Sequence, residues 1–307
     1  MAKLIQTSHG TRSEAFGPVE WGLLASIALM WGSSFLWIAI GLEGFEPGLI
    51  AFLRVALGAS FLGLMSRARR GIEREDWPRV ALLGLVWVAI PFTLFPVAQQ
   101  WIDSSTAGMI NGAMPLFTAV VATLLLRTMP GARQLIGLAV GFAGVVLVSL
   151  PAAGEGGSRL LGIGLVLLAT ILYGLAANLA VPLQQKYGAL PVVWRAQLAS
   201  VVAMLPYGLI SIPGSSFRLS SLGAVLILGF LSTGVALVAM AVLVGRAGAT
   251  RGALAIYFIP VVATILGVVF RDETVEPVVF AGIALIIAGA GLASRRERRR
   301  EPVPAPA

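Results

Sequence analysis

Two stretches, STAGMINGAMPLFTAVVATLLL at residues 105–126 and ATRGALAIYFIPVVATILGVVF at residues 249–270, read as two copies of one membrane helix. Each is long and apolar, and each carries an internal proline: Pro115 in the first copy and Pro260 in the second, 145 residues later. Similarity at a fixed offset indicates a duplicated structural unit. We therefore interpret the chain as two copies of one helical unit.

The composition of the whole chain agrees with a membrane protein. Of its 307 residues, 58% are hydrophobic and 12% are charged, with a mean hydropathy of +0.91. Soluble domains contain about 25% charged residues. The net charge of +8 lies in short clusters between apolar stretches, which is typical of membrane topology signals and not of a nucleic-acid site. With no cysteine, and with His9 as the single histidine, we expect no metal, no cofactor and no thiol chemistry.

A membrane-spanning helix needs about 20 mostly apolar residues. Ten segments of the sequence meet this requirement: 21–42, 47–65, 78–99, 104–126, 133–150, 160–182, 190–212, 219–244, 249–270 and 276–293. The polar stretch before residue 21 lacks the short apolar core of a signal peptide, so we expect the first apolar segment to be retained in the membrane.

The positive charges predict the orientation. With the N-terminus inside, 17 of the 22 Lys and Arg residues fall in cytoplasmic segments and only three, Arg159, Arg218 and Arg271, fall in outer loops. The other two, Arg54 and Arg195, lie inside apolar segments. We therefore predict a multi-pass membrane protein with both termini in the cytoplasm and the lipid bilayer as its surroundings.

Five helices per copy have a consequence for topology. After an odd number of crossings the second copy starts on the opposite side of the membrane, so the predicted fold is all-α, with ten transmembrane helices arranged as two inverted five-helix repeats. The predicted parts are a cytoplasmic tail (1–20), the first repeat (21–150), an outer linker (151–158), the second repeat (159–293) and a basic cytoplasmic tail (294–307). Inverted repeats are a common plan of alternating-access transporters. A duplication that merely enlarged a helical bundle is the alternative.

Three motifs carry a family resemblance: MWGSSFLWIAI (30–40), the Pro47 to Arg54 segment, and GRAGATRGALAIYFIPVVATILGVVFRDE (245–273). In this order and spacing the chain resembles the EamA-type branch of the drug/metabolite transporter superfamily over residues 21–293. The resemblance implies a ten-helix inner-membrane carrier that usually exports small metabolites such as amino acids. In one departure from the family, the glutamate often found after the fourth helix is replaced by Thr128, whereas Glu273 follows the ninth.

Ionisable residues within membrane spans are costly and therefore indicate function. Arg54 lies seven residues beyond Pro47, about 10 Å along its helix, near the expected midplane. Its guanidinium suits a substrate carboxylate; the alternative is that it binds backbone carbonyls and fixes helix packing. For Arg195, near the cytoplasmic end of its helix, we expect the side chain to reach the membrane interface.

Aromatic and small polar residues within the spans complete the predicted substrate site, although plain helix packing also explains each of them singly. The predicted substrate-binding residues are Trp31, Ser34, Arg54, Trp87, Asn111, Thr118, Tyr173 and Tyr257. Pro115 and Pro260 each remove a backbone hydrogen bond within their helix and are predicted hinges. Gly137, Gly141 and Gly144 form a predicted small-residue face for close helix contact.

These features predict a secondary transporter, an exporter of amino acids or related amphipathic compounds, with no catalytic residues. A nucleotide-sugar or phosphate-ester carrier on the same scaffold is the nearest alternative, and a membrane-embedded enzyme or a channel is more remote. All 14 Asp and Glu residues lie in tails, loops or helix ends, so we expect uniport or substrate exchange and not a carboxylate proton relay. The cargo, the direction of transport and a possible homodimer stay open.

Overall fold

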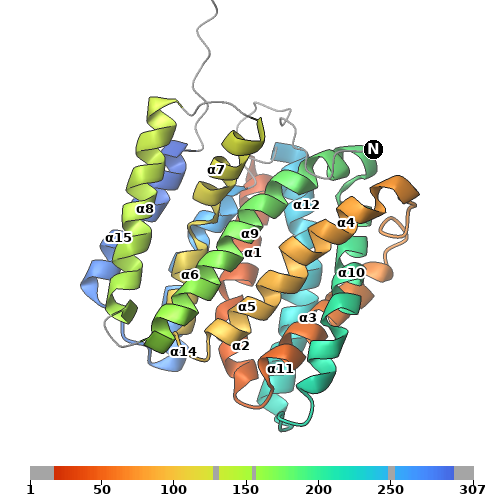
Figure 1. The fold of residues 1–307 in the computed structure, drawn as a ribbon, viewed down its shortest axis with the longest axis horizontal. Coiled ribbons are helices and arrows are strands. Elements are labelled where there is room, and N and C mark those ends of the chain that lie inside the picture. Colours follow the sequence, from red (N-terminus) through yellow and green to blue (C-terminus); the bar gives the residue numbers. More distant parts are fainter. Residues whose placement is uncertain (1–16, 127–130, 154–156, 248–252, 294–307) are drawn as a thin grey trace, which may run out of the picture.

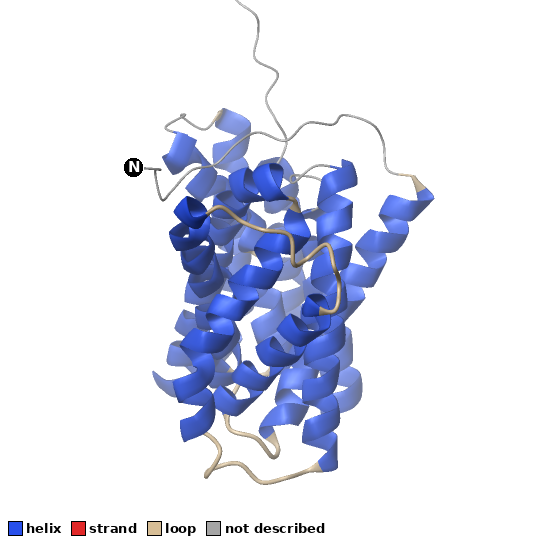
Figure 2. Ribbon diagram, turned by 90° about the vertical axis from the view of Figure 1, so that its right-hand side faces the viewer, coloured by secondary structure: helices blue, strands red, loops and turns tan. Residues whose placement is uncertain are grey.

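The computed structural model describes residues 17–126, 131–153, 157–247 and 253–293. Every regular element in these ranges is helical, and the helices form one bundle with connecting loops at its two ends (Figure 2). The first half contains α1 (Pro18–Gly32), α2 (Ser34–Leu42), α3 (Pro47–Gly63), η1 (Arg74–Asp76), α4 (Trp77–Gly84), η2 (Leu85–Ala89), α5 (Ile90–Ala98), α6 (Ser104–Asn111), α7 (Met114–Leu126) and α8 (Ala132–Ala153). The second half contains α9 (Gly157–Tyr187), α10 (Ala189–Ile210), α11 (Leu219–Ile227), η3 (Leu228–Val235), α12 (Ala236–Ala247), η4 (Ala253–Phe258), α14 (Ile259–Arg271) and α15 (Pro277–Ala293).

Six helical segments among the described residues are long and apolar enough to cross a membrane, and four further apolar helices are shorter. An all-helical, polytopic membrane protein is therefore the observed fold class. The predicted linker at 151–158 is shorter than expected, because α8 continues to Ala153 and α9 begins at Gly157. The first helix starts at Pro18, whose fixed backbone angle suits the first helical turn.

The two predicted hinge prolines do not lie within continuous helices. Pro115 is the second residue of α7, after a break at residues 112–113, and Pro260 is the second residue of α14, after the 3₁₀ turn η4. The prediction of a hydrogen bond removed inside a helix is thus wrong: at the start of a helix the missing N–H has no intrahelical partner to lose. The two breaks touch, since a Cβ built on Gly112 would lie 2.3 Å from Pro260 Cγ.

The α8–α15 pair stands at one edge of the bundle (Figure 1) and packs unusually closely. A Cβ on Gly144 would lie 2.6 Å from the carbonyl oxygen of Gly282, and one on Gly289 would lie 2.3 Å from the amide nitrogen of Gly141. Only glycine allows backbones this near each other. The predicted small-residue face is therefore observed as a helix–helix contact.

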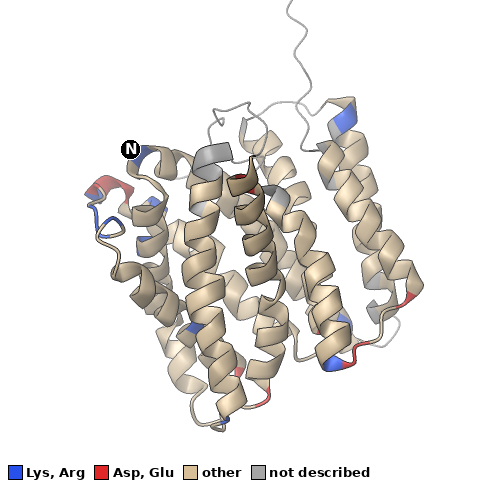
Figure 3. Ribbon diagram, turned by 180° about the vertical axis from the view of Figure 1, so that it is seen from behind, with Lys and Arg blue, Asp and Glu red and all other residues tan. Residues whose placement is uncertain are grey.

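Charged residues gather at the two ends of the bundle, and few lie in its middle (Figure 3). At one end, here called the basic end, the segment 64–79 carries five arginines, and Lys186 forms ion pairs with Glu73 (2.6 Å) and Asp76 (2.9 Å). At the opposite, acidic end, Arg271 pairs with Glu43. There Glu273 accepts hydrogen bonds from the amides of Ser104 (3.0 Å) and Ser105 (2.9 Å), so it caps the start of α6.

Candidate functional site

Arg54 lies in the middle of α3, with its side chain inside the bundle. It is 5% exposed. Its Nε donates a hydrogen bond to Thr233 Oγ1 (2.9 Å), and its guanidinium carbon lies 3.9 Å from the centre of the Phe92 ring. Neither terminal nitrogen donates a hydrogen bond to any residue that the structure describes, and no described carboxylate pairs with it. A buried guanidinium that keeps both terminal groups unused is suited to bind an anion from outside the protein.

The wall opposite Arg54 comes from the second half of the chain. Thr233 belongs to the π-helical segment η3, and Gln197 of α10 donates from Nε2 to the carbonyl oxygen of Thr233 (3.4 Å). Gly58, one turn after Arg54 on α3, leaves the space for both: a Cβ there would lie 2.6 Å from Thr233 Cγ2 and 3.2 Å from Gln197 Oε1. The site thus sits where α3, α10 and η3 meet. π-Helical turns are frequent at functional sites.

Aromatic rings cover the other side of Arg54. Phe92 and Tyr173 approach from α5 and α9, and Tyr173 lies within electrostatic range of the guanidinium. The Tyr173 ring is 5.8 Å from the Phe95 ring, which is 5.4 Å from the Phe35 ring. These rings form an apolar wall beside a single cation, as an amphipathic ligand would require.

Of the predicted site residues, Trp87 and Tyr173 gather with Arg54. Both pack against the apolar cluster that contains Phe92. Trp31 lies at the edge of this region: its Nε1 donates to the carbonyl oxygen of Ser232 (2.9 Å), the residue before Thr233. Ser34 is buried but donates to Met30 one turn earlier (3.0 Å), so its hydroxyl is used within its own helix.

The remaining predicted residues lie around the breaks near Pro115 and Pro260. Asn111 ends α6, is 5% exposed, and has no hydrogen-bond partner for Oδ1 within the described part of the chain. The hydroxyl of Thr118 donates to Met114 (3.0 Å), and its carbonyl oxygen accepts from Asn178 (3.1 Å). Tyr257 is buried in η4. The structure therefore divides the predicted residues between the Arg54 region and the helix breaks.

Three residues beside Arg54 are absent from the sequence prediction: Phe92, Gln197 and Thr233. Gln197 carries a signal that the sequence contains, since it is an uncharged polar side chain inside the apolar segment 190–212. Phe92 and Thr233 carry none, because phenylalanine and threonine are ordinary residues of membrane helices. Their role follows only from the packing of α5 and η3 around α3.

The second buried arginine has a different environment. Arg195 is 8% exposed and donates to the carbonyl oxygens of Ala68 (3.0 Å), Arg69 (3.2 Å) and Pro191 (3.3 Å). Two of these acceptors belong to the loop after α3, at the basic end of the bundle, and the third lies one turn earlier in α10. The expectation that the side chain reaches the membrane interface stays a prediction. Arg195 therefore ties α10 to that loop.

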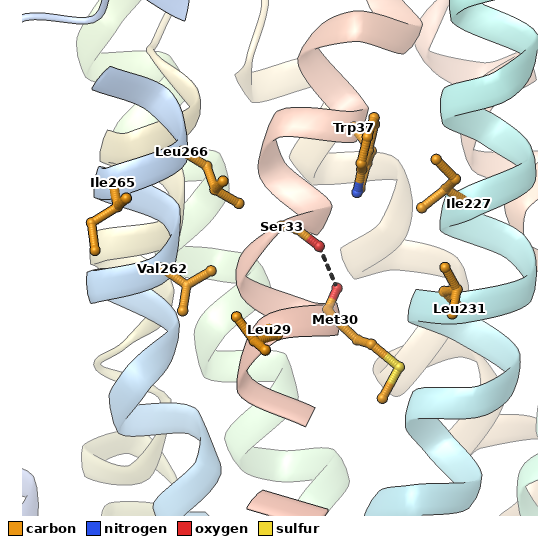
Figure 4. Close-up of a pocket in the computed structure, with 9 residues that line it drawn as sticks. All are labelled: Leu29, Met30, Ser33, Trp37, Ile227, Leu231, Val262, Ile265 and Leu266. Atoms are coloured by element: carbon orange, nitrogen blue, oxygen red, sulfur yellow. Dashed lines mark hydrogen bonds between the residues drawn. The ribbon is translucent and has the colours of Figure 1, made fainter. Parts of the chain in front are cut away.

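A separate apolar groove of about 390 Å³ opens on the side of the bundle between α1, α2, α11, η3 and α14 (Figure 4). Its lining consists of Leu29, Met30, Ser33, Trp37, Ile227, Leu231, Val262, Ile265 and Leu266. None of the predicted substrate-binding residues lines it. Several of its walls are widely exposed, with Leu29 at 60% and Ile265 at 55%, as expected for a face turned to lipid.

Known proteins resemble this chain over nearly all of its length. The model of the EamA-like transporter family matches residues 20–150 and again 160–295. An uncharacterized transporter of Archaeoglobus fulgidus is 24% identical over 277 residues, which cover 90% of this chain and 99% of the relative. A probable terminal-alkyne amino-acid exporter of Streptantibioticus cattleyicolor is 25% identical, covering 92% and 95% of the two chains.

Two further matches add the membrane and the fold. The uncharacterized inner membrane transporter YedA of Escherichia coli K12 is 26% identical over 281 residues, or 87% of each chain. A solved crystal structure with 20% identity superposes with a TM-score of 0.65, covering 89% of this chain and 96% of its own, which shows a shared fold. With the family model matched in both halves of its sequence, the chain belongs to the EamA-like transporter family, whose members are membrane transporters.

Proposed function

We propose that this transporter exports small carboxylate-bearing metabolites, such as amino acids or related amphipathic compounds, by alternating access around Arg54. The observation that carries the proposal is the state of the Arg54 guanidinium, which is buried among neutral groups with both terminal nitrogens unused by the described residues. A ligand carboxylate would accept two parallel hydrogen bonds from it. The relative named as a probable terminal-alkyne amino-acid exporter supports the same class of cargo.

Alternating access rests on a ten-helix architecture of two inverted five-helix repeats. The family model matches the chain twice, and π-helical turns occur at matching places, η2 in the first half and η3 in the second. The contacts between helices also agree with two copies of one unit. Helix α8 contacts α15 and α6 contacts α14; α5 contacts α9 as α12 contacts α1; and α3 contacts η3 as α10 contacts η2. Each of these contacts between the halves is thus made either by two counterparts or by a pair whose counterparts are also in contact.

The distribution of charge supports an orientation with the basic end, and so both termini, in the cytoplasm of a bacterial cell. Among the described residues, the five arginines of segment 64–79, Arg133 and Lys186 lie at the basic end, whereas Arg159, Arg218 and Arg271 share the other end with six Asp and Glu residues. During a transport cycle the ion pairs at the basic end and the Glu273–Ser104 contact at the acidic end would open in turn.

The rival cargo, a nucleotide sugar or another phosphate ester, fits the site less well. A phosphate group is typically held by several cations. In the described structure a single cation, Arg54, lies against the Phe92 ring, with its guanidinium carbon 3.9 Å from the ring centre. The described Asp and Glu residues lie at the bundle ends, away from Arg54, so the proposed mode is uniport or substrate exchange. Reconstituted transport that depends steeply on a proton gradient would contradict that mode.

The experiment is a comparison of exported metabolites. Wild type, Arg54→Ala and the matched control Arg218→Ala, whose arginine is exposed at the acidic end, are expressed in a bacterium at equal membrane levels. The spent medium is then profiled by untargeted mass spectrometry. We expect one or a few amino acids or related carboxylates to accumulate with wild type and with Arg218→Ala but not with Arg54→Ala. Equal accumulation with all three proteins would remove Arg54 from the mechanism, and accumulation of phosphate esters would replace the cargo class.

A further inference from the structure

Gln197 presents a buried hydrogen-bond acceptor that nothing in the described structure uses. Its side chain is fully buried in α10, and Nε2 donates to the carbonyl oxygen of Thr233 (3.4 Å). Because the nearby Thr233 group is an acceptor, this bond assigns the amide nitrogen to that side and leaves Oε1 at the other end. Oε1 has no hydrogen-bond partner among the described residues. Because buried polar groups are normally satisfied, an unused amide oxygen calls for an explanation.

The explanation lies in the position of Gln197 relative to Arg54. Both side chains bond the same residue, Arg54 to the hydroxyl of Thr233 (2.9 Å) and Gln197 to its carbonyl oxygen (3.4 Å). Gly58, one turn after Arg54 on α3, lies against both partners: a Cβ built there would come too close to Thr233 Cγ2 (2.6 Å) and crowd Gln197 Oε1 (3.2 Å). The region therefore holds unused donors on Arg54 and an unused acceptor on Gln197, on two buried side chains that bond the same threonine.

We propose that Gln197 determines specificity by binding the ammonium group of a zwitterionic α-amino acid whose carboxylate is held by Arg54. This inference rests on the proposed function. A ligand with only a carboxylate would leave the Gln197 oxygen unsatisfied, and one with only an ammonium would leave Arg54 unpaired. An α-amino acid carries both groups on one carbon and satisfies both. Its side chain then lies toward the rings of Phe92 and Tyr173, which favours an apolar or aromatic side chain.

The test uses three ligands that differ only in these groups: L-phenylalanine, 3-phenylpropanoate, which lacks the ammonium, and 2-phenylethylamine, which lacks the carboxylate. Their affinities for the purified full chain in detergent are measured from the ligand-dependent rise in its thermal unfolding midpoint. For wild type we expect phenylalanine to bind at least about tenfold more tightly than 3-phenylpropanoate, because loss of a partner for a buried acceptor has that order of effect.

The variant Gln197→Met keeps the side-chain length and removes the acceptor. We expect it to bind phenylalanine and 3-phenylpropanoate equally. The matched control is Gln99→Met, since Gln99, at the end of α5, also has a buried amide without partners in the described structure. Gln99→Met should keep the wild-type preference. A Gln197→Met protein that still prefers phenylalanine as strongly as wild type does would overturn the proposal.

A second variant, Gln197→Glu, tests the proposal by increased binding of 2-phenylethylamine, and it is used if Gln197→Met does not fold. Its carboxylate still accepts from an ammonium but pairs with Arg54, so we expect weaker binding of 3-phenylpropanoate and tighter binding of 2-phenylethylamine. An unchanged order of affinities in this variant would contradict the role of Gln197. If no ligand of the three stabilises wild type while Arg54-dependent export is seen in spent medium, the zwitterion model fails and the proposed function stands.

Discussion

Two arginines are buried in this bundle, and the regions around them differ in how completely they satisfy the guanidinium. Arg195 donates to three backbone carbonyl oxygens and lies near the rings of Trp194 (5.2 Å) and Trp77 (6.0 Å). Arg54 has one hydroxyl and one ring, and its terminal nitrogens are unused within the described structure. A protein can use the same costly residue as a structural tie where acceptors are supplied, or as a binding group where they are withheld.

The largest effect on transport is expected from a change that keeps the positive charge at residue 54 and removes the planar guanidinium group. Arg54→Lys should lower transport about tenfold or more, because an ammonium cannot form two parallel hydrogen bonds to a carboxylate. Its thermal unfolding midpoint in detergent should stay close to that of wild type, since the described structure loses a single hydrogen bond. Transport is measured as export of the accumulated metabolite, normalised to membrane protein. Full activity in Arg54→Lys would mean that point charge alone, without fork geometry, is sufficient.

The reverse outcome is expected at the other arginine. Arg195→Ala removes the donors of three carbonyl groups near the basic end, and a buried polar group left without a partner costs about 1–3 kcal/mol. The unfolding midpoint should therefore fall clearly, whereas export per folded molecule stays close to wild type. If Arg195→Ala instead kept its stability and lost transport, the division between a structural and a binding arginine would be wrong.

A smaller effect is expected from the hydroxyl that positions Arg54. Thr233→Val keeps the shape of the side chain and removes the acceptor of the Arg54 Nε hydrogen bond, so the guanidinium is held less firmly in its orientation. Substrate affinity should fall several-fold. The matched control is Thr264→Val in α14, because the Thr264 hydroxyl is buried without a partner in the described structure and its removal should be neutral or stabilising.

The smallest effect is expected at the rings beside Arg195. Trp194→Phe keeps an aromatic face but loses the hydrogen bond from Nε1 to the carbonyl oxygen of Ala59 (3.1 Å), worth about 0.5–1.5 kcal/mol. The decrease in unfolding midpoint should be less than for Arg195→Ala. A larger decrease would show that the hydrogen bond from Trp194 to Ala59 stabilises the bundle more than the hydrogen bonds of Arg195 do.

The sequence predicts the helical membrane fold and the family because both depend on composition and on local patterns. Apolar length marks the helices, clustered arginines mark one end, and the repeated proline marks the duplication. The glycines at 141 and 144 predict a close helix contact, since small residues at this spacing leave one helix face flat. The prolines are a partial success: they mark the positions of the breaks but not their form, which depends on how α6 and α14 cross.

The candidate site shows the limit of such patterns. By sequence alone Arg54 and Arg195 look alike, each a single cation in an apolar segment after a proline. What separates them is the supply of acceptors: Arg195 meets carbonyl groups 126 and 127 residues away in the chain, and Arg54 meets one hydroxyl 179 residues away. Backbone carbonyls belong to every residue, so their arrangement leaves no trace in residue type. Residue types alone place two cations among the helices, and the packing of distant segments around them leaves the terminal nitrogens of Arg54, but not those of Arg195, without acceptors in the described structure.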